Sequence, residues 1–288
     1  MLPGNDARQQ QAGDAVAPPK IVAFGRLGTV CRLGLATRGN TSLTCDDVLD
    51  AIERGINYLN WCGHSDGLSR AIAEASARRR ELIVATQLQA RTADEARREI
   101  DAQCRTMGTD YIDVVTYYYV ESEDQWQAIV GPGGAAEGVE AAVTEGTVRA
   151  IGLTSHQRPL AARWAESGRL DMLMLRYNAA HRGAEQEVFP LTRRLAMPVV
   201  TYTGLRWGAL MRSTPDDPAH FHPPTAPQWY RFALCQEAIT TVLMAPNGRR
   251  ELEENLTLLE PWQGIDAAQL AAMQDHGDRV RRHAGHFP

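Results

Sequence analysis

The sequence predicts a (β/α)8 TIM barrel with a long loop after its seventh strand. Eight short apolar segments alternate with amphipathic segments, and this order of elements builds a closed parallel barrel. The apolar segments contain few polar residues, which is typical of strands that are covered on both faces. An open doubly wound sheet is the alternative, but no Gly-x-Gly-x-x-Gly motif follows a predicted strand. The predicted strands are residues 32–37, 56–60, 82–87, 112–119, 150–154, 172–177, 199–202 and 240–244.

Capping residues and glycines mark where the intervening helices begin and end. Thr44 and Asp47 form a capping-box pattern, and Gly55 ends the helix that follows. Thr92 opens a long helical segment with acidic residues in its first turn, and Gly108 ends it. Further helical segments are predicted for residues 158–168, 248–259 and 266–282.

The 288 residues divide into an expected tail and one expected domain. Residues 1–19 are rich in Gln, Ala, Asp and Pro without apolar periodicity, so we expect a flexible N-terminal tail. Residues 20–288 are expected to form a single barrel domain. Residues 204–228 contain five prolines and form the long loop, which we interpret as a wall of the substrate site.

Composition excludes several classes of function. The net charge of −5 offers no basic surface for nucleic acid. No apolar run is long enough to span a membrane, and the N-terminus lacks the apolar stretch of a signal peptide, so we expect a cytoplasmic protein. Lys20 is the only lysine among 30 basic residues, which argues against Schiff-base, pyridoxal phosphate and Walker A chemistry. The five cysteines form no CxxC pair, and no spacing demands a metal site; the oligomeric state stays open.

Eight segments resemble, in order, landmarks of the aldo-keto reductase superfamily, over roughly residues 20–260. The resemblance implies the (β/α)8 fold and reduction of carbonyl compounds with hydride from NADPH. The segments are RLGTVCRLGLATRG, DVLDAIERGINYLN, ELIVATQLQ, DYIDVVTYYYVE, VRAIGLTSH, LRYN, VVTYTGL and LMAPNGRRELEENL.

The positions that carry the family's chemistry hold other residues. The family uses a tyrosine as general acid, supported by an aspartate and a lysine, beside a histidine. Here Asn60 stands at the aspartate position, Gln87 at the lysine position and Tyr118 at the histidine position. The tyrosine position falls near Ser65, with His64 adjacent. A neutral Asn60–Gln87 pair supplies no charge that would lower the pKa of a phenol.

The positions that hold the family's cofactor are changed in part. Thr154 and Ser155 stand at the usual Ser-Asn pair and Met174 at the usual glutamine. Glu251 falls at the arginine that binds the 2′-phosphate, where a carboxylate would repel that group. We therefore expect no cofactor, with NADP as the alternative. In that alternative the resemblance assigns the cofactor to Tyr202, Arg249, Arg250 and Asn255.

Active sites of such barrels lie at the carboxyl ends of the strands. We expect Tyr118 as the acid there, with His64, Asn60 and Gln87 as the other catalytic residues. Arg176 is expected to anchor an anionic or strongly polar group through its forked guanidinium. Packing or ion pairing within the protein is the competing interpretation for each residue. The residues expected to bind substrate are Arg176, His181, His156, Tyr202, Trp207 and Arg206.

Three functions are compatible with these residues. The first is an enzyme that uses acid–base catalysis on a small polar, carbonyl-containing or anionic substrate without the usual hydride transfer, as a lyase, dehydratase or isomerase. The alternative is an NADPH-dependent aldo-keto oxidoreductase with an altered site. The third is a non-catalytic binding subunit. In each case we expect a small-molecule ligand and neither nucleic acid nor membrane as a partner.

Overall fold

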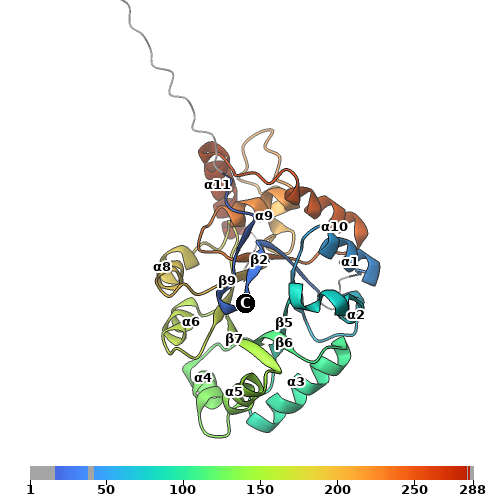
Figure 1. The fold of residues 1–288 in the computed structure, drawn as a ribbon. Coiled ribbons are helices and arrows are strands. Elements are labelled where there is room, and N and C mark those ends of the chain that lie inside the picture. The colour runs from blue at the N-terminus through green and yellow to red at the C-terminus, as the bar shows by residue number, and fades with distance from the viewer. Residues whose placement is uncertain (1–16, 38–41, 284, 286–288) are drawn as a thin grey trace, which may run out of the picture.

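A computed structural model describes residues 17–37, 42–283 and 285. Within these residues, eight parallel strands close into a barrel in the order β10-β3-β4-β5-β6-β7-β8-β9, so the predicted fold class is confirmed. Helices surround the barrel, as Figure 1 shows. The strands are β3 (Leu33–Ala36), β4 (Tyr58–Trp61), β5 (Ile83–Leu88), β6 (Ile112–Tyr117), β7 (Val148–Ser155), β8 (Met172–Arg176), β9 (Val199–Tyr202) and β10 (Thr241–Met244).

Each predicted strand overlaps an observed one, and the differences have local causes. Strand β6 ends at Tyr117, two residues earlier than predicted, because Tyr119 has a left-handed backbone with a φ of 42°. Strand β7 begins earlier than predicted, at Val148, since Ile112 of β6 pairs with that residue. The periodicity of apolar residues therefore locates the strands, whereas their ends depend on pairing with neighbours.

The helices follow the predicted punctuation. Thr44 and Asp47 form the capping box of the first helix, with their reciprocal hydrogen bonds both present. Gly108 ends α3 in the left-handed conformation, which glycine adopts at little cost. The helices are α1 (Cys45–Glu53), α2 (Gly67–Glu74), α3 (Ala93–Met107), α4 (Glu123–Val130), α5 (Ala135–Glu145), α6 (Arg158–Ala165), α7 (Ala184–Glu187), α8 (Phe189–Arg194), α9 (Ala226–Leu234), α10 (Arg249–Leu256) and α11 (Ala267–His283).

Apolar side chains fill both the inside of the barrel and the space between the strands and the helices. Inside the barrel, Ile83, Val114 and Met172 are buried on β5, β6 and β8. Gly152 makes room for this packing, because a Cβ atom there would lie 2.3 Å from the sulfur of Met172. The amino ends of the strands are covered by a hairpin of β1 (Ile21–Ala23) and β2 (Thr29–Cys31), which lies across the barrel in Figure 1.

The segment before the hairpin contacts the domain. Residues 1–16 of the expected tail lie outside the described residues. The carbonyl of Pro18 accepts a hydrogen bond from the indole Nε1 of Trp262 at 2.6 Å. The ammonium of Lys20 donates to the carbonyl of Leu259 at 3.2 Å. The single lysine thus has a structural contact with the segment that follows α10.

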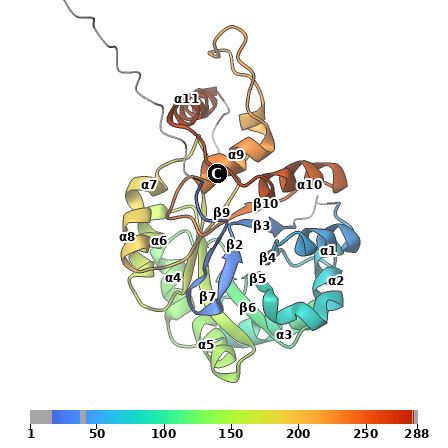
Figure 2. The ribbon, with the colours of Figure 1, turned by 45° about the horizontal axis from the view of Figure 1, so that its top comes forward.

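The long loop after β9 runs from Thr203 to Thr225 and lies beside the C-terminal helix. Figure 2 shows this orange loop projecting next to α9 and α11. Asp217 in the loop contacts His276 of α11, with 3.0 Å between Oδ1 and Nδ1. The side chain of Asp217 also accepts a hydrogen bond from Arg279 at 2.6 Å. The loop is therefore fastened to α11 through charged groups.

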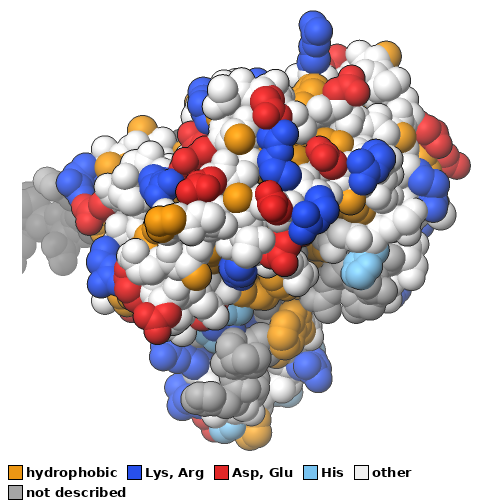
Figure 3. Space-filling view, turned by 90° about the horizontal axis from the view of Figure 1, so that it is seen from below, with side chains coloured by type: hydrophobic (Ala, Val, Ile, Leu, Met, Phe, Trp, Pro, Cys, Tyr) orange, Lys and Arg blue, Asp and Glu red, His pale blue; other side chains and the backbone are white. Residues whose placement is uncertain are grey.

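The outer surface mixes charges of both signs. On the face in Figure 3, basic and acidic side chains are interspersed, and no large patch of one sign is visible among the described residues. Charged side chains also pair across elements: Arg54 of the segment after α1 and Glu253 of α10 approach to 2.7 Å. None of the described helices is long and apolar enough to cross a membrane.

Candidate active site

A cavity of about 700 Å³ opens at the carboxyl ends of the strands. Its volume lies within the range that is usual for small-molecule sites. The four residues predicted to be catalytic all line it, although they come from different strands and loops. They are Asn60, His64, Gln87 and Tyr118.

Alternation along the strands brings these side chains to the cavity. Ile83 and Ala85 of β5 point into the barrel, so Gln87 follows on the same face two residues later. In β4, Tyr58 points inward and Asn60 follows it in the same way. In both β4 and β5, a polar residue therefore occupies the last inward position, where the barrel opens.

Three buried oxygen atoms around this cavity have no hydrogen-bond partner among the described residues. They are Thr37 Oγ1, Asn60 Oδ1 and Thr154 Oγ1. The amide of Asn60 meanwhile donates to the Cys62 sulfur at 3.6 Å. A buried polar atom without a partner costs about 1–3 kcal/mol. These atoms are therefore ready to bind the polar groups of a ligand or of water.

Aromatic rings form one side of the mouth. The Tyr119 ring stacks on His156, with 4.5 Å between centroids and an interplanar angle of 21°. Its centroid lies 4.2 Å from that of Tyr118 and 6.4 Å from that of Tyr202. Burial raises the pKa of Tyr119 to about 12, so its phenol stays neutral at physiological pH. Sequence reasoning did not single out Tyr119, because its left-handed backbone at the strand end was not foreseeable from alternation.

His156 forms a pair with Glu121 behind the aromatic rings. Its Nδ1 lies 3.2 Å from the Glu121 carboxylate, and its backbone N–H donates to the same oxygen at 2.9 Å. Burial lowers the pKa of His156; Glu121 opposes this effect and the positive charge of Arg176 adds to it. The imidazole is thus neutral at physiological pH, and Glu121 orients it.

Only two of the six residues expected to bind substrate line the cavity. These two are Tyr202 and Trp207; the Trp207 side chain is 57% exposed, and its φ of 52° is unusual for a bulky residue. His156, Arg176, His181 and Arg206 lie outside the cavity-lining set. Burial, followed by the charges of Arg176 and Arg206, lowers the pKa of His181 to about 4. Arg176 and Arg206 therefore place positive charge near His181, and none of these three side chains lines the cavity.

Arg206 has a structural contact that the sequence did not predict. It is 2% exposed, and its guanidinium donates to the carbonyl of Val280 at 2.9 Å and to that of Gly285 at 3.2 Å. It binds carbonyl groups at the end of α11, where a helix leaves carbonyls without partners. This contact directs Arg206 toward α11 rather than toward a ligand in the cavity.

The residues expected to hold NADP are dispersed. Tyr202 lines the cavity, Asn255 is buried in α10, and Arg250 is exposed. Arg249 is drawn toward α1, with 3.4 Å to Asp47 and 3.3 Å to Asp50. The side chain of Glu253 also pairs with Arg249. Arg249 therefore already has three carboxylate partners.

Glu251 is the acidic residue at the α10 end of the cavity. It lines the cavity together with Asn247, and its carboxylate accepts a hydrogen bond from the backbone N–H of Asn247 at 2.8 Å. The hydrogen bond holds this negative charge at the start of α10, where the helix dipole favours it. The carboxylate would repel a phosphate group brought to the same place.

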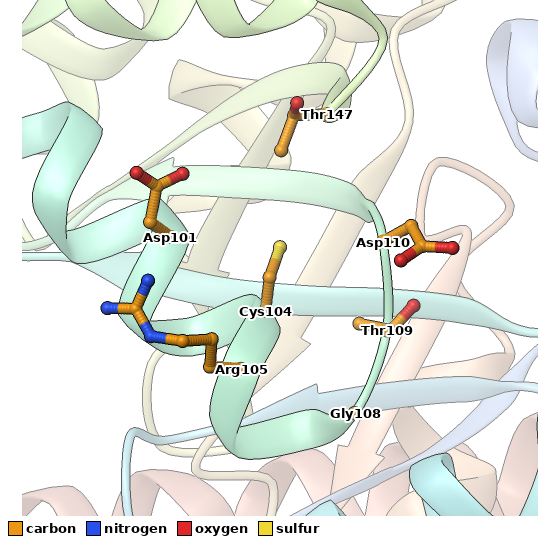
Figure 4. A pocket seen from close by; sticks show the side chains of 7 residues that line it. All are labelled: Asp101, Cys104, Arg105, Gly108, Thr109, Asp110 and Thr147. Carbon is orange, nitrogen blue, oxygen red and sulfur yellow. The ribbon is translucent and has the colours of Figure 1, made fainter.

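A second depression, of about 440 Å³, lies at the other end of the barrel. It is formed by the end of α3 and the turns before β6 and β7, which are the amino ends of the strands. Figure 4 shows Cys104 in its middle, with Asp101 and Asp110 on different sides of the thiol. Burial raises the pKa of Cys104 to about 11, so the thiol is protonated and a poor nucleophile. The described residues contain no group of three or more side chains placed to hold a metal ion.

Comparison with known proteins places the chain in a family. The model of the Aldo/keto reductase family matches residues 28–271. The chain belongs to the aldo/keto reductase family. The predicted resemblance is thereby confirmed, and it extends over most of the barrel.

Relatives and solved structures agree with this assignment. The NADH-specific methylglyoxal reductase of Escherichia coli (strain K12) is 24% identical over 217 residues, which cover 63% of this chain and 66% of that protein. The holo form of aldo-keto reductase AKR11C1 from Bacillus halodurans superposes with a TM-score of 0.71 at 19% identity, covering 89% of this chain and 96% of that one. Its apo form gives a TM-score of 0.70 at 18% identity, with coverages of 89% and 95%. At these identities the two structures show a shared fold.

These findings bear on the expected cofactor and on the expected type of reaction. The expectation that the barrel works without a cofactor is wrong, because the family match is accompanied by a relative named for NADH and by a neighbour known in a holo form. The family match also favours the oxidoreductase alternative over the lyase-type reaction.

Proposed function

We propose that this protein is a nicotinamide-dependent oxidoreductase that interconverts a small carbonyl compound and its alcohol in an altered aldo-keto reductase site. One observation carries the proposal. A single cavity is shared by the polar strand ends around Asn60 and Tyr118, by the loop after β9, and by the start of α10 at Asn247. Such a cavity has one end for a reacting group and another for the remainder of a dinucleotide.

The residues present fit such a cofactor. The hydroxyl of Thr154 is buried, lines the cavity and has no partner among the described residues, and Tyr202 lines the same cavity. The loop after β9 lines the cavity with a backbone in unusual conformations, as Thr203 has a φ of 59° and Trp207 one of 52°. Strained backbone of this kind is found preferentially at ligand sites. We assign cofactor contacts to Thr154, Tyr202 and this loop; when bound, the cofactor supplies or accepts hydride.

The chain's own residues supply the remaining chemistry. Tyr118 is a phenol on the cavity wall, and we assign it to proton transfer at the substrate oxygen. Asn60 and Gln87 are neutral hydrogen-bonding groups on adjacent strands that orient the substrate. The part of Tyr118 in proton transfer is assigned from its position on the cavity wall.

The acidic end of the cavity bears on the choice of cofactor. Glu251 lines the cavity, and Arg249 is held by carboxylates of α1 and α10. A phosphate on the ribose would therefore meet a negative charge without a free guanidinium from Arg249. We accordingly propose NADH rather than NADPH as the cofactor.

Binding and turnover should be measured separately. Fluorescence titration of the purified protein with NADH tests binding, and consumption of NADH with methylglyoxal, the compound for which the curated relative is named, tests turnover. We expect micromolar binding and measurable turnover. Tyr118→Phe should reduce turnover at least tenfold and leave NADH binding intact.

Tyr111→Phe is the matched control, because Tyr111 lies at the amino ends of the strands, where its ring contacts Arg79. It should change neither binding nor turnover. If neither NADH nor NADPH binds, the proposal fails. If NADH binds but a broad panel of carbonyl compounds and alcohols shows no turnover, the non-catalytic binding subunit becomes the better interpretation.

A further inference from the structure

Three neutral polar side chains stand side by side at the ends of β3, β4 and β5. They are Thr37, Asn60 and Gln87, and all three line the cavity. The backbone N–H of Thr37 donates to the carbonyl of Asn60 at 3.2 Å, which holds the first two ends together. We call these three residues the amide arc. Thr37 and Asn60 are 2% and 1% exposed, so neither is a surface group.

The amide arc contains hydrogen-bonding capacity that the protein leaves unused. Neither Thr37 Oγ1 nor Asn60 Oδ1 has a partner within the described part of the chain. The amide oxygen of Asn60 is an acceptor only, so it requires an O–H or N–H donor from a ligand. A substrate with a carbonyl alone offers no such donor.

The arc faces the part of the cavity assigned above to the cofactor. In the barrel order, β3, β4 and β5 lie on one side and β7, β8 and β9 on the other. Thr154 and Tyr202 belong to the second side. A substrate held between the two sides therefore contacts the cofactor on one side and the amide arc on the other. The arc can contact groups of the substrate other than the reacting carbonyl.

Charge around the cavity selects against anions. Among the described residues that line it, only His64 and Glu251 carry ionisable acid or base groups other than phenol and thiol. Arg176 and Arg206 lie outside the cavity-lining set. A carboxylate on the substrate would lose hydration at the arc and meet no arginine or lysine among the described lining residues, which is strongly unfavourable.

We propose that the amide arc is the substrate-specificity subsite and that it selects uncharged carbonyl compounds with a hydroxyl group on the neighbouring carbon. In this arrangement the substrate hydroxyl donates to Asn60 Oδ1 and exchanges hydrogen bonds with Thr37. The Gln87 amide has donors for an oxygen of the same molecule. The predicted difference in turnover between substrates rests on the proposed oxidoreductase function. The predicted difference in substrate binding does not.

Three compounds of similar size separate the possibilities: hydroxyacetone has the hydroxyl, acetone lacks it, and pyruvate has a carboxylate instead. With the full chain and NADH, we expect kcat/KM for hydroxyacetone to exceed that for either other compound by about tenfold, the value of one satisfied buried hydrogen bond. Without any cofactor, hydroxyacetone should raise Tm more than acetone or pyruvate at equal concentration. The thermal measurement remains informative even if the cofactor proposal fails.

Variants assign the effect to the arc. Asn60→Leu keeps the approximate volume and removes the amide, and Thr37→Val removes only the hydroxyl. Each should bring the hydroxyacetone-to-acetone ratio close to one, in turnover and in the thermal shift. Gln127→Ala is the control, because it removes an amide from the exposed face of α4 and should keep the ratio.

Equal responses to all three compounds would overturn the inference, as would a larger response to pyruvate. An unchanged ratio in both arc variants would also overturn it. If Asn60→Leu fails to fold, Thr37→Val alone decides between a specific and a non-specific cavity. If NADH binds but the three compounds give equal responses, the amide arc is not a specificity subsite. The oxidoreductase proposal would then be unaffected.

Discussion

Glu251 accepts a hydrogen bond from the backbone N–H of Asn247, with 2.8 Å between Oε2 and N, at the end of the cavity formed by α10. This contact holds a carboxylate at the place where an additional phosphate on a dinucleotide would be repelled. Arg249, in the first turn of the same helix, is turned toward Asp47 and Asp50 of α1. The proposed preference for NADH therefore rests on the charge of Glu251, which substitution can remove.

Substitution of Glu251 should change the ratio of the two cofactor affinities. We expect Glu251→Gln to narrow the preference for NADH over NADPH by roughly fivefold, because it removes one partly screened charge. Fluorescence titration with each nucleotide measures the ratio. Glu237→Gln, at an exposed position outside the cavity lining, should leave the ratio unchanged. A wild-type protein that binds NADPH more tightly would contradict the prediction.

The neutral pair at the strand ends invites a double-mutant cycle. Asn60 pairs in register with Ala85, and Gln87 follows two residues later on the same inward face. Asn60→Asp and Gln87→Lys each place one uncompensated charge in a buried site and should destabilise the fold. The double variant should recover part of the loss, with a coupling energy above about 1 kcal/mol.

Urea unfolding of the wild type, the two single variants and the double variant gives the coupling energy. Turnover with a small aldehyde should be higher in the double variant than in either single one, since the resemblance assigns a charged pair to these positions. Strictly additive stability changes would show that the two side chains do not interact.

Acid stability should depend on Asp217, which faces His276, Arg279 and the backbone N–H of Thr214. Burial alone would raise the pKa of Asp217, but hydrogen bonds from Thr214, His276 and Arg279 outweigh it and lower the pKa to about 2. The stabilisation is complete above the unfolded pKa of about 4 and disappears as the pH falls toward 2.

Asp217→Asn should therefore cost about 2 kcal/mol at neutral pH and flatten the fall in stability between about pH 4 and pH 2. Urea unfolding across this range measures both effects. Asp216 also contacts α11, through Arg282 and His283, but its side chain is 43% exposed. Asp216→Asn is thus the control with the smaller effect. An equal loss in both variants would mean that burial of Asp217 is unimportant.

The amino ends of the strands contain a buried ion network that should dominate stability. The Asp113 side chain is fully buried, and its two oxygens contact Arg79 and Arg149, each at 2.7 Å. Asp113→Asn leaves the buried Arg79 without its counter-charge, so we expect a loss of about 3–5 kcal/mol in urea unfolding. Glu253→Gln, which disturbs an exposed pair with Arg54, should have little effect. NADH affinity should stay unchanged in both variants, because neither residue lines the cavity.

Local patterns in the sequence determined the barrel and which side chains could reach its mouth. Apolar runs such as residues 83–86 required strands covered on both faces, and alternation then put Asn60 and Gln87 at the last inward positions. Residue types at those positions also indicated a neutral pair. Each of these features depends on residues close together in the sequence, so it can be predicted without the tertiary structure.

Only the tertiary structure decided what the arginines and the tyrosines contact. Arg206 is directed to the carbonyl of Val280, 74 residues away, and Arg249 to Asp47, 202 residues away. The stacking of Tyr119 on His156 likewise depends on a left-handed residue at the end of β6. The partner of a long side chain depends on which distant segments lie within its reach in the folded chain. The periodicity of apolar residues contains no information on those contacts.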